Sequence, residues 1–355
     1  MKRRDFISGT TMASVALAAR PVRALERSFE TQPLKENTGK WLNAYYFCAH
    51  TYTLVPRHVR EDLQWMADAG TDAVSLSILE QDLFAAVENV EIVCNEAARV
   101  GLEVYAVPSR WGGLFAGAPK VPSLFSSTHP ESLHRVKGGE PFFSNFSGVR
   151  SSIYYQEVLE FFCSSLDSVL DLWDIRGIIL DEPKSYSLDY SPGAIEKLGP
   201  EPSHEAHLAS VVEFHEKICM HIKETHPRVR TCLFNQANTS DLAVELSARM
   251  DHLNDFGADG RPWGPEDGGQ LESEGKTLLG PGERHLMAAR ESGKRPLWLI
   301  ENHNMRTKDI RLMERRMPEI LEKGVEHLIY YYYPRNLEDP DVNMRAVARS
   351  ISGFK

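Results

Sequence analysis

Two apolar segments that lie far apart in the chain each end in acidic residues. Residues 177–180 lead directly into Asp181 and Glu182, and residues 296–300 lead into Glu301. A short apolar run of this kind is typical of a strand that is buried on both faces. An ionised carboxylate at the end of such a strand must be paired or must face a wet cleft. Two carboxyl groups that meet in one cleft can divide proton donation and nucleophilic attack between them.

The elements that would position these acids follow a regular alternation of short apolar runs and amphipathic stretches. The predicted strands are residues 41–47, 72–78, 102–107, 177–182, 230–234, 250–256, 297–301 and 327–333. Strands that alternate with helices predict a parallel sheet, and eight such strands close a (β/α)8 TIM barrel. The alternative is an open doubly wound sheet, which would carry a glycine-rich phosphate turn after its first strand, and residues 46–50 contain no glycine.

We therefore expect a single α/β barrel domain over residues 27–355, with long loops at about 108–150 and 257–282. In such a barrel the carboxyl ends of all strands meet at one mouth, where active sites lie. The acids of the fourth and seventh predicted strands would meet there.

Composition and charge exclude several classes of protein. The net charge of -10 and the absence of a basic stretch interleaved with aromatic residues argue against a nucleic-acid partner. No apolar run is long enough to predict a membrane span. The five cysteines show no Cys-x-x-Cys spacing, so neither a zinc site nor a dense disulfide framework is expected.

The first 26 residues have the features of a targeting segment. Arg3 and Arg4 precede a weakly apolar stretch, and small residues follow at 22–24, where a signal peptidase would cleave. This segment resembles a bacterial twin-arginine export signal. The resemblance implies that the protein is exported to the periplasm or beyond, and a disordered basic tail is the alternative.

The loops that follow the predicted strands carry polar and aromatic side chains suited to holding a polar ligand. The candidates are His50, Arg110, Trp111, Asn235, Gln236, Asp255, Trp263, His303 and Tyr332. The tryptophans could instead be packing anchors, and the arginines could form structural ion pairs. In the same way, Asp181 or Glu182 could cap a helix or pair with Lys184.

Glutamates at the ends of strands 4 and 7 resemble the catalytic pair of the retaining glycoside hydrolases of clan A, a superfamily of (β/α)8 enzymes. The resemblance implies that Glu182 is the acid/base, that Glu301 is the nucleophile, and that the substrate is a carbohydrate. It implies no cofactor and no metal. Aromatic side chains at the mouth of such a barrel stack on sugar rings, and polar ones bind sugar hydroxyls.

This chain departs from the clan at one position. The clan usually has Asn before the strand 4 glutamate, and this chain has Asp181. An Asp-Glu pair at a strand end also occurs in hexosaminidase-like barrels, where the Asp orients an acetamido group of the substrate. Asp181 is therefore a third catalytic candidate, and its role is open.

Two other functions are compatible with the same residues. One is a metal-dependent sugar isomerase or epimerase, in which Glu182, Asp255, Glu301 and a histidine would supply hard-metal ligands. That ligand set is incomplete, because predicted strand 6 ends at Asp255 without an adjacent histidine. The other is a non-catalytic barrel that binds carbohydrate without turnover.

Overall fold

The structure is a computed structural model that describes residues 40–46, 54–117, 119–145, 147–334 and 337–354. The predicted export signal and the candidate His50 lie outside these residues. Within the described part of the chain, no helix is long and apolar enough to cross a membrane.

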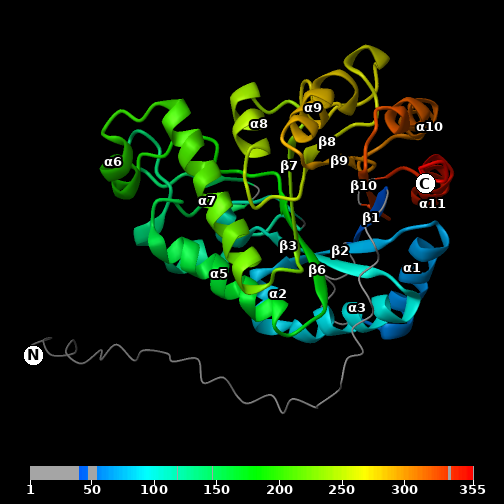
Figure 1. Ribbon diagram of the computed structural model, residues 1–355, viewed down its shortest axis with the longest axis horizontal. Coiled ribbons are helices and arrows are strands. Elements are labelled where there is room, and N and C mark those ends of the chain that lie inside the picture. The colour runs from blue at the N-terminus through cyan, green and yellow to red at the C-terminus, as the bar shows by residue number, and fades with distance from the viewer. Residues whose placement is uncertain (1–39, 47–53, 118, 146, 335–336, 355) are drawn as a thin grey trace, which may run out of the picture. The chain divides into compact units, whose positions relative to one another are not determined.

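Eight parallel strands close into a barrel (Figure 1). They are β1 (Trp41–Tyr46), β2 (Ala73–Leu79), β3 (Glu103–Ser109), β6 (Ile175–Asp181), β7 (Arg230–Gln236), β8 (Asp255–Gly260), β9 (Arg295–Ile300) and β10 (His327–Tyr332). Each strand pairs with the next one in the ring, and β1 pairs with β10 to close it. The predicted (β/α)8 fold is confirmed.

Helices follow the strands and pack on the outside of the barrel (Figure 1). They are α1 (Pro56–Asp68), α2 (Glu80–Ala85), α3 (Val87–Val100), α4 (Leu124–Thr128), α5 (Gln156–Leu170), α6 (Pro192–Leu198), α7 (His204–Thr225), α8 (Asp241–Ala248), α9 (Glu283–Glu291), α10 (Thr307–Glu322) and α11 (Pro340–Ile351). A small hairpin, β4 (Phe143–Ser144) with β5 (Gly148–Val149), lies in the loop after β3. Gly101 ends α3 in the left-handed conformation, as the helix-glycine-strand pattern predicts.

Alternation along the strands separates two apolar clusters. Side chains that point inward, such as Tyr45, Phe234 and Tyr331, fill the barrel itself. Their neighbours along the strands point outward and form a larger core against the helices. Because successive strand residues face opposite sides, a position next to an inward residue cannot reach the barrel interior.

The long loop after β3 is held by a buried carboxylate. Glu80, at the start of α2, is 2% exposed and accepts hydrogen bonds from the backbone of Gly112 (2.8 Å), from the Ser123 hydroxyl (2.8 Å) and from the backbone of Phe125 (2.7 Å). These bonds tie both ends of the segment 112–125 to the mouth of the barrel. The loop is therefore an ordered wall of the mouth.

The predicted position of strand 6 is wrong. Strand β8 begins at Asp255 and runs to Gly260, so Asp255 lies at the opposite end of the barrel from the mouth. Residues 257–260 contain two glycines and an aspartate, which strands disfavour, so the sequence pattern predicts a loop there. Glycine is required there by packing, because a Cβ at Gly257 would lie 1.6 Å from the carbonyl oxygen of Leu297.

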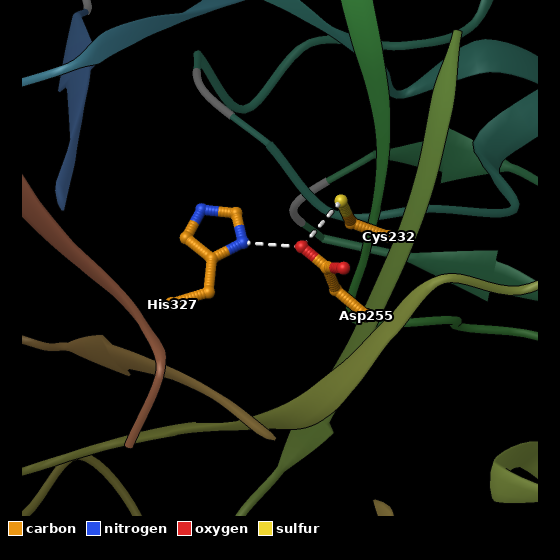
Figure 2. Close-up of side chains that lie close together, drawn as sticks. All are labelled: Cys232, Asp255 and His327. Atoms are coloured by element: carbon orange, nitrogen blue, oxygen red, sulfur yellow. Dashed lines mark hydrogen bonds and ion pairs between the residues drawn. The ribbon is translucent and has the colours of Figure 1, made fainter. Parts of the chain in front are cut away.

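Asp255 is a buried counterion rather than a ligand-binding residue of the mouth. It accepts hydrogen bonds from Arg230 (2.6 Å), Arg295 (2.6 Å) and the Nδ1 of His327 (2.7 Å), and the Cys232 thiol lies 3.5 Å away (Figure 2). Burial raises the pKa of Asp255, but these cationic and polar neighbours outweigh burial and hold it below its ordinary value. Two guanidinium groups on one carboxylate give this cluster a net positive charge, which disfavours a metal ion.

We expect Asp255→Asn to lower the free energy of unfolding by about 3 kcal/mol, because it leaves Arg230 and Arg295 without their buried counterion. Urea unfolding at neutral pH measures the loss. The control is Asp251→Asn, which changes an exposed aspartate nearby and should stay within about 0.5 kcal/mol of the parent. Equal stabilities for the two variants would show that the Asp255 network is dispensable.

Candidate active site

A cavity of about 340 Å³ opens at the carboxyl ends of the strands. Six of the predicted site residues line it, namely Arg110, Asp181, Glu182, Gln236, Glu301 and His303. The sequence thus brings the acids of strands 4 and 7 of the barrel, β6 and β9, to one site. It is a concave, polar pocket of the kind that binds a small ligand.

A lysine that no sequence pattern identifies lies between the two glutamates. The Nζ of Lys276 is 2.7 Å from Glu182 Oε1 and 2.5 Å from Glu301 Oε1. It also lies 3.0 Å from Asp259 and 3.0 Å from Glu272. Four carboxylates therefore surround one ammonium group, whose side chain is only 2% exposed.

The backbone fixes this lysine at the neck of the loop after β8. The Arg261 amide donates to the Lys276 carbonyl (3.1 Å), and the Leu278 amide donates to the Arg261 carbonyl (2.9 Å). The two ends of the loop are thus joined beside the strand, and Lys276 projects from the joint. Arg261 also donates to the Glu301 carbonyl (2.7 Å), which orients the end of β9.

The charged groups of this cluster shift one another's pKa values. Burial alone would lower the pKa of Lys276, but the surrounding carboxylates raise it well above its ordinary value. Burial raises the pKa of Glu182, yet the ammonium groups of Lys184 and Lys276 outweigh burial and hold it well below its ordinary value. These ammonium groups favour the ionised form of Glu182, whereas an acid/base role requires it to carry a proton.

Two aspartates beside Glu182 behave in the opposite way. Burial, and then the charge of Glu182, raise the pKa of Asp181 to about 6. The same two causes raise the pKa of Asp259 well above its ordinary value. Asp259 is hydrogen-bonded to Glu182 and is 1% exposed, but it is not among the residues that line the cavity.

An unusual backbone conformation lets Asp181 and Glu182 share one cavity. Consecutive residues of a strand normally point to opposite faces. Glu182 follows the last residue of β6 with φ of 39°, a left-handed value that non-glycine residues seldom adopt. Arg110, at the end of β3, has φ of 61°. Such backbone strain is typical of functional sites.

Several predicted ligand-binding residues do not reach the cavity. Trp111 is buried, donates to the Ile78 carbonyl (2.9 Å) and packs on Phe162. Trp263 is fully buried. Both tryptophans are packing anchors of their loops, so the prediction that they face the ligand is wrong.

The predictions for Asn235 and Tyr332 are also wrong, because each side chain points outward from the barrel. Asn235 accepts a hydrogen bond from Tyr186 (2.7 Å), and Tyr332 donates to Asp62 of α1 (2.9 Å). The neighbours Gln236 and Tyr331 line the cavity instead. A register error of one residue accounts for Tyr332, since the sequence shows four consecutive tyrosines and does not say which ones point inward.

Three charged residues of the site were missed by the sequence interpretation. Asp259 follows from a correct placement of β8, since it lies one residue before the end of that strand. Lys276 and Glu272 lie in the loop at 257–282, where no periodic pattern exists to place them. Glu272 lines the cavity, and a hydrogen bond with His303 lowers its pKa.

Comparison with known proteins identifies the fold but not a family. No protein-family model and no curated protein matches the chain. Among solved structures, it is similar to a β-galactosidase from the psychrophilic Marinomonas ef1, with a TM-score of 0.64 and 12% identity over 88% of this chain. The chain spans 58% of that protein's length.

Two further glycoside hydrolases share the barrel. The catalytic domain of a β-amylase from Paenibacillus polymyxa has a TM-score of 0.57 and 12% identity, over 88% of this chain and 97% of that one. An exo-β-N-acetylglucosaminidase from Vibrio harveyi has a TM-score of 0.55 and 9% identity, over 88% and 54% of the two chains. At these identities the likeness establishes a shared (β/α)8 fold.

Replacement of Lys276 by methionine tests the charge balance of the site. We expect a loss of about 3 kcal/mol in the free energy of unfolding at pH 8, because four carboxylates lose their shared cation. The loss should shrink as the pH falls toward about 4.5, because protonation of the carboxyl groups then relieves their repulsion. Unfolding in urea at several pH values measures both effects.

The matched control is Lys197→Met, which breaks an ion pair with Glu213 at the surface. An exposed pair of this kind contributes at most about 1 kcal/mol. If the Lys276→Met loss were no larger, or did not vary with pH, Lys276 would not be the countercharge of the cluster.

Proposed function

We propose that this protein is a glycoside hydrolase that acts with retention of anomeric configuration. One observation carries the proposal: oxygen atoms of Glu182 and Glu301, which follow strands β6 and β9, lie within 4.8 Å of each other at the cavity. Retaining enzymes place their two carboxyl groups about 5–5.5 Å apart, whereas inverting enzymes need about 6.5–9.5 Å to admit a water molecule. The separation here supports the shorter arrangement.

Glu301 has the surroundings of a nucleophile. Its carboxylate is 2% exposed, and Oε2 has no hydrogen-bond partner among the described residues. In the proposed reaction a Glu301 oxygen forms a bond to the anomeric carbon while the bond from that carbon to the leaving oxygen breaks. A carboxyl group at the end of β6 supplies a proton to the leaving oxygen. Water then releases the sugar and returns a proton to that carboxyl group.

The bridging ammonium must leave the space between the glutamates before a sugar ring can enter it. Lys276 has a flexible side chain on a fixed backbone, and Asp259 and Glu272 remain as partners when it turns away. The carboxylates that surround the ammonium would then surround the positive charge that develops on the sugar in the transition state. The carboxylates therefore surround a positive charge in both states: the Lys276 ammonium in the free protein, and the sugar in the transition state.

The wider proposal is an exported enzyme with a carbohydrate substrate. The twin-arginine-like segment at residues 1–26 supports export. Cell fractionation of the bacterial host with an antibody to the protein checks this directly. Protein confined to the cytoplasm would contradict export.

A panel of aryl glycosides tests the function. We expect the wild-type protein to hydrolyse at least one of them, and Glu301→Gln to lose at least about a hundredfold in kcat/KM because a neutral amide cannot attack the anomeric carbon. Glu182→Gln should also lose most activity. Release of the aryl group and circular dichroism of each variant are measured together.

Glu274→Gln is the control, because Glu274 is an exposed residue of the same loop as Lys276. It should keep the wild-type rate. Near-wild-type turnover by Glu301→Gln would contradict the assignment of the nucleophile.

A metal-dependent sugar isomerase is the second candidate, and one observation favours it. Glu182, Asp259 and Glu301 each place an oxygen within 4.8 Å of the others, and His303 forms a similar group with Glu272 and Glu301. The structure therefore supplies, through Asp259, the strand 6 ligand that Asp255 cannot supply. Against this function, the ammonium of Lys276 lies among these carboxylates, so the residues do not fit a metal ion while it is there.

Exposure to a chelator separates the two functions. We expect dialysis against EDTA to leave aryl-glycoside hydrolysis and the thermal midpoint unchanged, because Lys276 already neutralises the cluster. Loss of turnover that is restored by Mn²⁺ or Mg²⁺ would favour the isomerase. Activity assays before and after dialysis, with wild type in untreated buffer as reference, give the answer.

A further inference from the structure

The contacts of Glu182 stabilise its ionised form. Its Oε1 accepts from Lys276 (2.7 Å), and its Oε2 accepts from Gln236 (3.1 Å) and from Lys184. Two ammonium groups, an amide and the carboxyl group of Asp259 therefore donate to one carboxylate. A carboxyl group in such surroundings is stabilised as the anion, and it cannot donate a proton to a leaving group without first losing these partners.

Other carboxyl groups at the cavity can be compared in the same way. Glu272 contacts Lys276 and His303, which favour its anion. Glu301 contacts Lys276 and must be ionised to attack carbon. Asp259 is not among the residues that line the cavity, so a leaving oxygen cannot reach it directly. Asp181 is the remaining carboxyl group of the described cavity wall.

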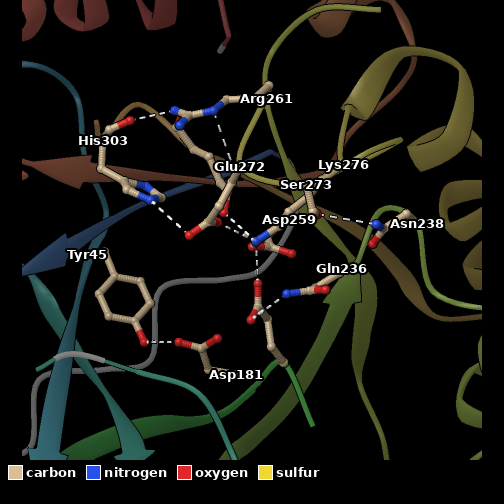
Figure 3. A network of polar contacts seen from close by, with 12 residues as sticks. Tyr45, Asp181, Gln236, Asn238, Asp259, Arg261, Glu272, Ser273, Lys276 and His303 are labelled. Atoms are coloured by element: carbon tan, nitrogen blue, oxygen red, sulfur yellow. Dashed lines mark hydrogen bonds and ion pairs between the residues drawn. The ribbon is translucent and has the colours of Figure 1, made fainter. Parts of the chain in front are cut away.

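Asp181 has the geometry of a proton donor. It lies at the carboxyl end of β6, lines the cavity and accepts one hydrogen bond at Oδ2 from the Tyr45 hydroxyl (2.6 Å; Figure 3). The positive charges of Lys184 and Arg110 also act on Asp181, but more weakly than burial and the charge of Glu182. The groups that face it are Tyr45, Tyr331, Glu182, Lys184 and Arg110.

We propose that Asp181, rather than Glu182, is the general acid of the hydrolysis proposed above. This inference rests on that function. The proton on Asp181 passes to the leaving oxygen as its bond to the anomeric carbon breaks, and Glu301 forms the new bond. In the second step Asp181 takes a proton from the attacking water, and the bond between Glu301 and the sugar breaks. Glu182 remains an anion throughout, stabilised by Lys184 and Gln236 after Lys276 has turned away.

The acidity of Asp181 supports this assignment. Burial, and then the charge of Glu182, raise its pKa to about 6, so a substantial fraction is protonated in mildly acidic solution. The catalytic form is the protonated one, and kcat/KM should therefore fall as the pH rises through about 6. Glu182 contributes by its negative charge, which is one reason that the pKa of its neighbour is high.

Leaving-group dependence distinguishes an acid from a carboxylate that only holds the site together. A dinitrophenyl glycoside leaves without protonation, whereas an alkyl glycoside of the same sugar requires it. We expect Asp181→Asn to lose at least about a hundredfold in kcat/KM on the alkyl glycoside and much less on the dinitrophenyl glycoside. Added azide should accelerate Asp181→Asn and give a glycosyl azide of retained configuration.

Glu182→Gln serves as the comparison and should lose similar factors on both substrates. Azide should not rescue it. If Glu182→Gln showed the leaving-group dependence and Asp181→Asn lost both activities equally, Glu182 would be the acid and the inference would be wrong. If the wild-type protein hydrolysed neither glycoside for any sugar tested, the proposed function itself would fail, and that result is distinguishable from the first.

Two further variants test whether the effect of Asp181→Asn comes only from a structural role of Asp181. Asp62→Asn removes another tyrosine-carboxylate contact, which is partly buried on the outside of the barrel and joins Asp62 to Tyr46 and Tyr332 (2.9 Å each), and it should leave the leaving-group dependence unchanged. Tyr45→Phe removes the donor that stabilises the Asp181 anion, so its pKa should rise and the fall in kcat/KM should move to higher pH. A profile that moved to lower pH, or did not move, would contradict the role of Asp181.

Discussion

The site depends on one interaction: a buried lysine ammonium that four carboxylates share. Carboxylates from β6, β8 and β9 could not lie within 4.8 Å of one another unless a cation separated them or protons neutralised them. Lys276 supplies the cation, and its backbone is fixed where the loop after β8 closes on itself. The ion pairs are favourable only as a set, since removing one member leaves the others buried and uncompensated.

The rest of the barrel positions these charges. Glu80 accepts a hydrogen bond from the long loop after β3, and Arg261 donates one to the carbonyl oxygen of Glu301, which follows β9. At the opposite end of the barrel Asp255 joins β7, β9 and β10 through Arg230, Arg295 and His327. The barrel thus has one ionic network around Asp255 at one end and another around Lys276 at the other end. Four members of the network around Lys276, namely Glu182, Glu272, Lys276 and Glu301, line the cavity.

The fold and half of the site could be predicted from the sequence because they depend on local patterns. Apolar runs that end in an acidic residue predicted Glu182 and Glu301 as site residues, and helix-glycine-strand joints predicted the barrel. Strand β8 was misplaced because close packing against Leu297 demands a glycine, which lowers the strand signal. Lys276 and Glu272 could not be found, since only the closed loop brings them beside the strands. Tyr331 and Tyr332 differ by one position of register, which decides whether a ring faces the cavity or a helix.

Adjacent acids with opposite protonation are the chemical result of this arrangement. A left-handed backbone at Glu182 turns it toward the same cavity as Asp181, although neighbours in a strand normally diverge. Glu182 then receives the cations, and Asp181 receives the tyrosine hydroxyl and the negative charge of its neighbour. Environments that push the pKa values of two carboxyl groups apart are what acid and base roles at one pH require. The second acid of the β6 end is therefore more than a departure from the usual asparagine, because it can hold the proton that Lys276 denies to Glu182.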